Sequence, residues 1–235
     1  MNEHIVKAYD EELTALAGQI TEMGGLAEEI VSEAVLTLTR LDADKANEVI
    51  AKDARIDKMQ TDLEEQAILL IARRQPVAGD LRDIVAALRI SNDLERVGDL
   101  AKNIAKRVII ISDSVQSKKL TLGVEHLSEM AQMQLKNVLD AYAQRDEEMA
   151  NLVRERDEEI DALYTSLFRE LLTYMMEDPR QISMCAHLLF CAKNIERIGD
   201  HATNIAENVY YMERGEMPGS DRPKSDELSA IENGA

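Results

Sequence analysis

The chain has 235 residues and carries 45 acidic against 27 basic side chains, a formal net charge of −18. This charge repels nucleic-acid phosphates and anionic bilayers, so we expect no nucleic-acid partner and no membrane insertion. Any membrane association would be peripheral, through partner proteins. With 4 prolines, 10 glycines and no tryptophan, the composition favours an all-α protein.

The start of the chain lacks a basic segment followed by an apolar one, and no apolar run approaches the ~20 residues of a membrane-spanning helix. Cys185 and Cys191 are six positions apart in one predicted helix, so they point to different sides and do not form a local disulfide. We therefore expect a cytoplasmic protein, because cysteines stay reduced in the cytosol.

Apolar residues recur in steps of three and four through most of the chain, which predicts six helices. Pro76 lies where a first-turn proline is tolerated, and Asp178 is a capping residue directly before Pro179. The pair Gly24-Gly25 interrupts the first helix and indicates a slight bend or a close helix approach. The predicted helices span residues 3–40, 42–73, 77–112, 122–143, 146–177 and 179–213.

Two segments of the chain occur twice. Residues 88–108 keep 10 of 21 residues when they are aligned on 189–209, and 42–57 keep 7 of 16 on 146–161. The shifts are 101 and 104 positions, so the two copies follow each other in the same order. This internal duplication predicts two pseudo-symmetric three-helix bundles. The predicted domains are residues 1–115 and 116–214, followed by a mostly mobile tail at 215–235.

The duplicated segments place acidic side chains along one face of each helix. Glu95, Asp99 and Asn103 fall at i, i+4 and i+8 and therefore stack along one side of the third predicted helix. Asp53 and Asp57 form a similar pair in the second helix, where Asp53 falls on the apolar stripe itself. Counting from the turn brings the two pairs level across antiparallel helices. The second copy repeats these relations with Asp157, Asp161, Glu196, Asp200 and Asn204.

Carboxylates at this spacing repel one another, which calls for a cation or for basic partner groups. One isolated pair usually marks a solvated helix face, whereas duplicated pairs that face each other favour metal binding. Arg96 and Arg197 lie about 100° round from the rows, beside them rather than within them. Oxygen ligands without a thiolate suit Mg²⁺, Mn²⁺, Ca²⁺ or iron, and Zn²⁺ is a further candidate. The alternative interpretation is a docking face for a basic partner.

The sequence contains no visible nucleophile with a base, no glycine-rich phosphate loop and no dinucleotide fingerprint. We therefore predict no catalytic and no cofactor-binding residues beyond the metal ligands. Long helices without a substrate-pocket motif favour a regulator that works by protein contact. The competing hypothesis is a metal-dependent hydrolase acting on phosphate compounds, in which carboxylate-held metals activate water.

Three stretches of the chain, running from Arg73 to Arg82, from Leu94 to Asp99 and from Ile195 to Ala206, resemble the PhoU family of phosphate-uptake regulators. The resemblance covers both halves of the chain in order. It implies two three-helix bundles, with multinuclear metal clusters held by the Asp/Glu-x-x-x-Asp pairs named above. It further implies negative regulation of the phosphate-starvation response, through the phosphate ABC transporter and its sensor histidine kinase. We expect a homodimer or a higher oligomer.

Overall fold

A computed structural model of the chain describes residues 2–112 and 118–219. In this part of the chain all regular structure is helical, which confirms the all-α prediction. No helix in these two ranges is long and apolar enough to cross a membrane. The elements are α1 (Asn2–Arg40), α2 (Ala43–Arg74), α3 (Ala78–Ile111), α4 (Lys118–Gln144), α5 (Glu147–Glu155), α6 (Asp157–Glu177), the 3₁₀ turn η1 (Pro179–Gln181) and α7 (Ile182–Arg214).

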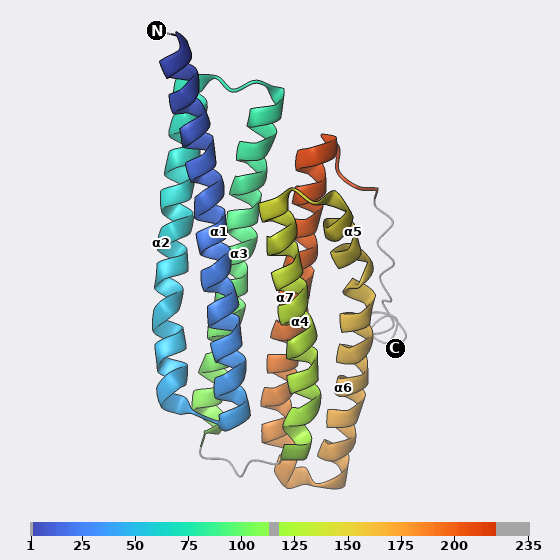
Figure 1. Cartoon of the computed structure of the whole chain (residues 1–235). Helices are drawn as coiled ribbons and strands as arrows, with labels where there is room; N and C mark the ends of the chain where they lie inside the picture. Colours follow the sequence, from blue (N-terminus) through green and yellow to red (C-terminus); the bar gives the residue numbers. More distant parts are fainter. Residues whose placement is uncertain (1, 113–117, 220–235) are drawn as a thin grey trace, which may run out of the picture.

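The first half of the chain forms one bundle from α1, α2 and α3, and the second half forms another from α4, the α5–α6 pair and α7 (Figure 1). The bundles lie side by side, with α3 packed against α7 and α1 against α4. This arrangement confirms the two predicted bundles. The predicted boundary between residues 115 and 116, and residues 220–235 of the predicted tail, lie outside the described residues.

The turns that lead into the second helix of each half are built alike. Leu41 and Arg145 adopt left-handed backbone conformations, with φ of 51° and 53°. The next residues, Asp42 and Asp146, each accept a hydrogen bond from the backbone amide three positions on, at 3.0 Å. These caps satisfy an amide that the first helical turn leaves unpaired, so the same local chemistry starts α2 and α5.

Two predicted helices are divided differently in the structure. The predicted fifth helix is interrupted at Arg156 and becomes α5 and α6. The predicted sixth helix opens with the 3₁₀ turn η1, so α7 begins only at Ile182. Asp178 is the predicted cap and accepts a hydrogen bond from the Arg180 amide at 3.1 Å. The amide that bonds Asp178 is only two positions further along the chain, which fits a tight first turn. Such 3₁₀ geometry is common at helix starts.

The glycine pair in α1 marks a close approach between the two halves. A Cβ atom added to Gly24 would lie 2.6 Å from the Leu139 side chain of α4, whereas a Cβ on Gly25 would meet nothing within 4 Å. The first helix continues through both glycines. The structure therefore contains the predicted close approach at Gly24.

Candidate metal centres

The first candidate centre lies between α2 and α3. Asp53 projects from the buried stripe of α2, with 3% of the residue exposed, and Asp57 lies one turn further along at the surface. Glu95 and Asp99 face this pair from α3. The charges of Asp53, Asp57 and Asp99 all act on Glu95, so the structure brings the two predicted pairs together. These four carboxylates are called the first cluster.

Lys102 lies inside the first cluster, one turn after Asp99 on α3. Its ammonium donates a hydrogen bond to Asp99 Oδ1 at 2.7 Å and a closer one to Asp53 Oδ2 across the helix pair. The Lys102 side chain is 23% exposed, so solvent screens this charge only in part. The first cluster therefore contains a cation of its own.

Burial and neighbouring charges together shift the pKa values of the first cluster. Burial raises the pKa of the Asp53 carboxyl, and the hydrogen bond from Lys102 works against that shift. Burial also raises the pKa of Glu95, and the neighbouring Asp99 charge adds to it. The hydrogen bonds to Asp53 and Asp99 raise the pKa of Lys102, because they stabilise the ammonium.

The second candidate centre lies between α6 and α7. Burial raises the pKa of the Glu196 carboxyl, and the charges of Asp200 and Asp161 add to the shift. Lys193 donates a hydrogen bond to Glu196 Oε1 at 2.7 Å from one turn earlier on the same helix. The four carboxylates Asp157, Asp161, Glu196 and Asp200 are called the second cluster.

A glutamine from α4 takes the place of the buried aspartate in the second half. A Cβ on Gly98 would lie 3.0 Å from Ile56 Cδ1 and 3.2 Å from Asp53 Oδ1. In the second copy, a Cβ on Gly199 would lie 3.0 Å from Ile160 Cδ1 and 3.1 Å from Gln134 Oε1. Gly98 and Gly199 correspond in the duplication and are called the motif glycines. The oxygen that faces the motif glycine therefore belongs to Asp53 in the first half and to Gln134 in the second.

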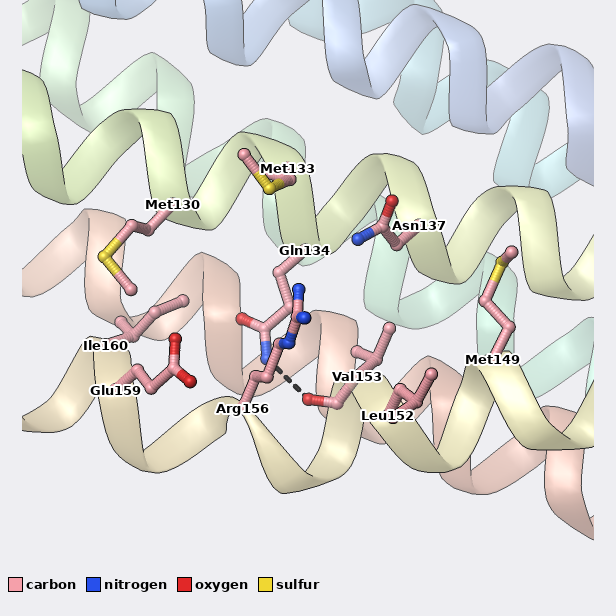
Figure 2. A pocket seen from close by; sticks show the side chains of 10 residues that line it. All are labelled: Met130, Met133, Gln134, Asn137, Met149, Leu152, Val153, Arg156, Glu159 and Ile160. Atoms are coloured by element: carbon pink, nitrogen blue, oxygen red, sulfur yellow. Dashed lines mark hydrogen bonds between the residues drawn. The ribbon is translucent and has the colours of Figure 1, made fainter.

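Gln134 also accounts for the interruption at Arg156. Figure 2 shows its side chain reaching from α4 to the end of α5, where its amide donates a hydrogen bond to the Val153 carbonyl at 2.9 Å. In an uninterrupted helix that carbonyl would accept from the amide of Asp157. A side chain inserted into the hydrogen-bond ladder is a common cause of a helix break. The predicted ligand Asp157 consequently stands in the first turn of α6, not in the middle of a helix.

The break also changes the outer surface of the second half. A cavity of about 380 Å³ opens beside it, lined mainly by apolar side chains that include Met130, Met133 and Met149 (Figure 2). At the corresponding surface of the first half, Lys52 donates hydrogen bonds to Glu29 and Glu33, each at 2.6 Å. The two copies therefore differ on the surface as well as in the cluster.

The two predicted asparagines have different surroundings. Asn103 is exposed on α3. Asn204 lies in the contact between the bundles, where its amide donates a hydrogen bond to Asp93 Oδ1 at 3.2 Å. His201 Nδ1 lies 2.9 Å from the same oxygen, so a histidine of α7 also takes part in this contact.

The oxygen donors of both clusters fit a hard divalent cation. One carboxylate oxygen in each half, Asp53 Oδ1 and Glu196 Oε2, is buried without a hydrogen-bond partner, and a cation would satisfy it. Among the described residues, no three histidine, cysteine, aspartate or glutamate side chains are already arranged around a common point. The ten predicted ligands therefore remain a prediction, and metal binding would involve side-chain movement.

Two residues that contact the candidate centres were absent from the site predicted from the sequence. Lys102 lies three positions after Asp99, a spacing that pairs charges on a helix, so the sequence did contain a signal for it. Gln134 carries no comparable signal, because its role depends on how α4 packs against α5. Position 30, which corresponds to Gln134 in the first half, is an isoleucine.

Comparison with known proteins assigns the family. The family model described as the PhoU domain matches residues 20–108 and 124–209, one copy in each half. The chain belongs to the PhoU family. A PhoU homologue from Rhizobium meliloti, a "phosphate-specific transport system accessory protein", is 59% identical over 228 residues, which cover 97% of this chain and 96% of the relative. Relatives with this name are described as accessory proteins, not enzymes, in agreement with the prediction of a non-enzymatic protein.

Solved PhoU structures have the same fold. The crystal structure of PhoU from Pseudomonas aeruginosa superposes with a TM-score of 0.86 at 38% identity, covering 88% of this chain and 100% of that one. A phosphate transport system regulatory protein from Streptococcus pneumoniae gives a TM-score of 0.83 at 28% identity, covering 90% and 99%. The family resemblance and the duplicated fold predicted from the sequence are thereby confirmed.

Proposed function

We propose that this protein is a cytoplasmic accessory protein of phosphate transport that regulates phosphate uptake and restrains the phosphate-starvation response. The observation that carries the proposal is the match of 97% of the chain to a relative named as a transport accessory protein. The name of the Streptococcus pneumoniae protein, which is described as regulatory, supports the same role.

The fold supports action by protein contact. Within residues 2–112 and 118–219, six helices are 21 residues or longer, and they form extended rigid surfaces that suit docking to larger partners. The proposed partners are the cytoplasmic ATPase side of the phosphate ABC transporter and the phosphate-sensor histidine kinase. The protein acts as a homodimer or higher oligomer that transmits the state of the transporter to the kinase.

The two clusters are the proposed metal sites. Asp53, Asp57, Glu95 and Asp99 hold metal in the first half, with Asn103 at its edge, and Asp157, Asp161, Glu196, Asp200 and Asn204 hold it in the second. A divalent or multinuclear metal, such as iron, Mn, Mg or Zn, supplies positive charge that balances crowded carboxylates. Burial of Asp53 and Glu196 favours compensation of their charge by a cation.

Deletion of the gene tests the regulatory role. In phosphate-rich medium, the deletion strain is expected to express a phosphate-starvation reporter constitutively, and the wild-type gene should restore repression. Normal repression in the deletion strain, together with metal-dependent phosphatase turnover by the pure protein, would instead support the hydrolase hypothesis.

Elemental analysis of protein purified without chelators tests the metal sites. Glu95→Ala with Asp99→Ala should lower the metal content of the first half and leave the second largely occupied. The matched control is Asp62→Ala with Glu65→Ala, which removes two exposed charges from α2 outside the clusters. Background metal in the wild-type protein and in both variants would contradict metal binding and favour a docking face for a basic partner.

A further inference from the structure

Lys102 occupies a position that the proposed metal function does not use. Its ammonium lies between two helices and hydrogen-bonds one carboxylate from each, Asp53 of α2 and Asp99 of α3. Both carboxylates are proposed metal ligands. Ion pairs between neighbours on one helix are usually mobile and weak, but this cation links two elements and is largely shielded from solvent.

The ammonium and a divalent cation would compete for the same oxygen atoms. Lys102 takes Asp53 Oδ2 and Asp99 Oδ1, which leaves Asp53 Oδ1 buried without a hydrogen-bond partner. A metal that binds both aspartates needs lone pairs that now accept from Lys102. It would also bring a second positive charge next to the ammonium, and like charges at that range repel strongly when partly buried.

We propose that Lys102 is the resident cation of the first cluster and that a divalent metal binds there by displacing its ammonium. This inference rests on the proposed metal binding. It assigns control of metal affinity to a residue outside the ligand set. Lys102 offsets part of the negative charge of the first cluster without metal, and it lowers the metal affinity of that cluster.

The second half provides an internal comparison. Thr203 stands 101 positions after Lys102, is buried, and places its hydroxyl 3.5 Å from the Gln134 amide nitrogen. Lys193 does reach the second cluster, where it donates a hydrogen bond to Glu196 Oε1 of its own helix, and 49% of its side chain is exposed. A side chain this exposed can leave its carboxylate at little cost. Displacing Lys193 is therefore expected to cost less than displacing Lys102, whose side chain is 23% exposed.

Mn²⁺ titration of the full-length protein tests the displacement. Glu196→Gln with Asp200→Asn restricts binding to the first cluster, and this double variant is the parent for all comparisons. Adding Lys102→Met to this parent should tighten Mn²⁺ binding at least tenfold. Lys102→Gln should give the same increase, and it replaces Lys102→Met if the methionine disturbs folding. Lys106→Met removes the same charge one turn further along α3, at an exposed position, and should change the affinity less than twofold.

Chemical acetylation of the unmutated protein gives a second readout. An amine-reactive acetylating reagent should modify Lys102 slowly without metal, because both hydrogen bonds hold its ammonium in the cluster. Saturating Mn²⁺ should raise the Lys102 rate several-fold, measured by mass spectrometry, and leave the exposed Lys106 unchanged. A purely structural ion pair would not respond to Mn²⁺ in this way.

The outcomes separate the inference from the proposed metal function. Mn²⁺ binding by the parent, with equal affinity in both Lys102 variants and no change in Lys102 acetylation, would overturn the inference and leave metal binding intact. No Mn²⁺ bound by the wild-type protein or by any variant would overturn both. Tighter binding without Lys102, with faster acetylation in Mn²⁺, supports the inference.

Discussion

In the first half of the protein, the oxygen that faces the motif glycine belongs to Asp53, and an ammonium from Lys102 bonds the same carboxylate. In the second half, the oxygen in that place belongs to the neutral Gln134, and the residue at the lysine position is Thr203. At this glycine contact, one copy has a buried anion with its cation, and the other has a neutral amide beside a neutral hydroxyl. The duplication has therefore kept the helix contact while the charges changed together.

The largest difference between the halves is expected for removal of the cation. Without metal, Lys102→Met leaves the Asp53 charge buried and unpaired, which should lower the free energy of unfolding by about 3 kcal/mol. Thr203→Val at the equivalent position removes a neutral hydroxyl and should cost about 1 kcal/mol. Urea denaturation of chelator-treated protein measures both values.

A double variant serves as the control for this comparison. Adding Asp53→Asn to Lys102→Met removes both charges and should recover most of the lost stability. Equal losses of unfolding free energy in Lys102→Met and Thr203→Val would show that the two halves are energetically alike. That result would contradict a stabilising ion pair between Lys102 and Asp53.

Replacing the motif glycines should give the next largest loss of stability, and the loss is expected to be the same in both halves. Gly98 and Gly199 each face an isoleucine methyl 3.0 Å from the position of an added Cβ. Valine at either position overpacks the contact and should cost about 2 kcal/mol, partly offset by its higher helix propensity. Thermal unfolding of the two variants tests the agreement, with Gly25→Val as a control, because a Cβ at Gly25 meets nothing within 4 Å.

Periodicity and duplication predicted the helices and the two bundles well, because both signals are local or repeated. The capped turns after Leu41 and Arg145 show why: each depends on a few adjacent residues that occur in both copies. The carboxylate pairs of the first half could likewise be brought level by counting residues from a turn.

The differences between the halves could not be predicted in the same way. The break at Arg156 depends on a hydrogen bond from Gln134, which lies 19 positions before Val153 on another helix. Nothing in the local sequence of α5 and α6 indicates that contact. Asn204 matched the motif, yet it bonds Asp93 across the bundle interface, because that interface is a tertiary feature.

Removal of the inserted glutamine should have a moderate effect on stability and a visible effect on local structure. Gln134→Leu deletes the hydrogen bond to the Val153 carbonyl, which should cost about 1 kcal/mol. That carbonyl then becomes available to the Asp157 amide, and the break should close. Hydrogen exchange measured by NMR should show slower exchange at Asp157 in the variant.

The first half supplies the matched control for this change. Ile30→Leu alters the equivalent position, where α2 is already continuous, and should leave exchange around Asp53 unchanged. Unaltered exchange at Asp157 in Gln134→Leu would show that the break has another cause.

The smallest expected effects concern two cation–π contacts between α3 and α7. Arg107 lies 4.4 Å from the centre of the Phe190 ring, and Arg89 lies 5.4 Å from that of Tyr211. Positions 89 and 190 correspond in the duplication. The same place in the repeat therefore provides the cation, Arg89, in the first half and the aromatic ring, Phe190, in the second. Arg107→Gln should cost about 0.7 kcal/mol and Arg89→Gln about 0.5 kcal/mol, since the attraction weakens with distance. A double-mutant cycle with Phe190→Leu isolates the first contact, and a coupling energy near zero would show that Arg107 stabilises the interface through its aliphatic stem instead.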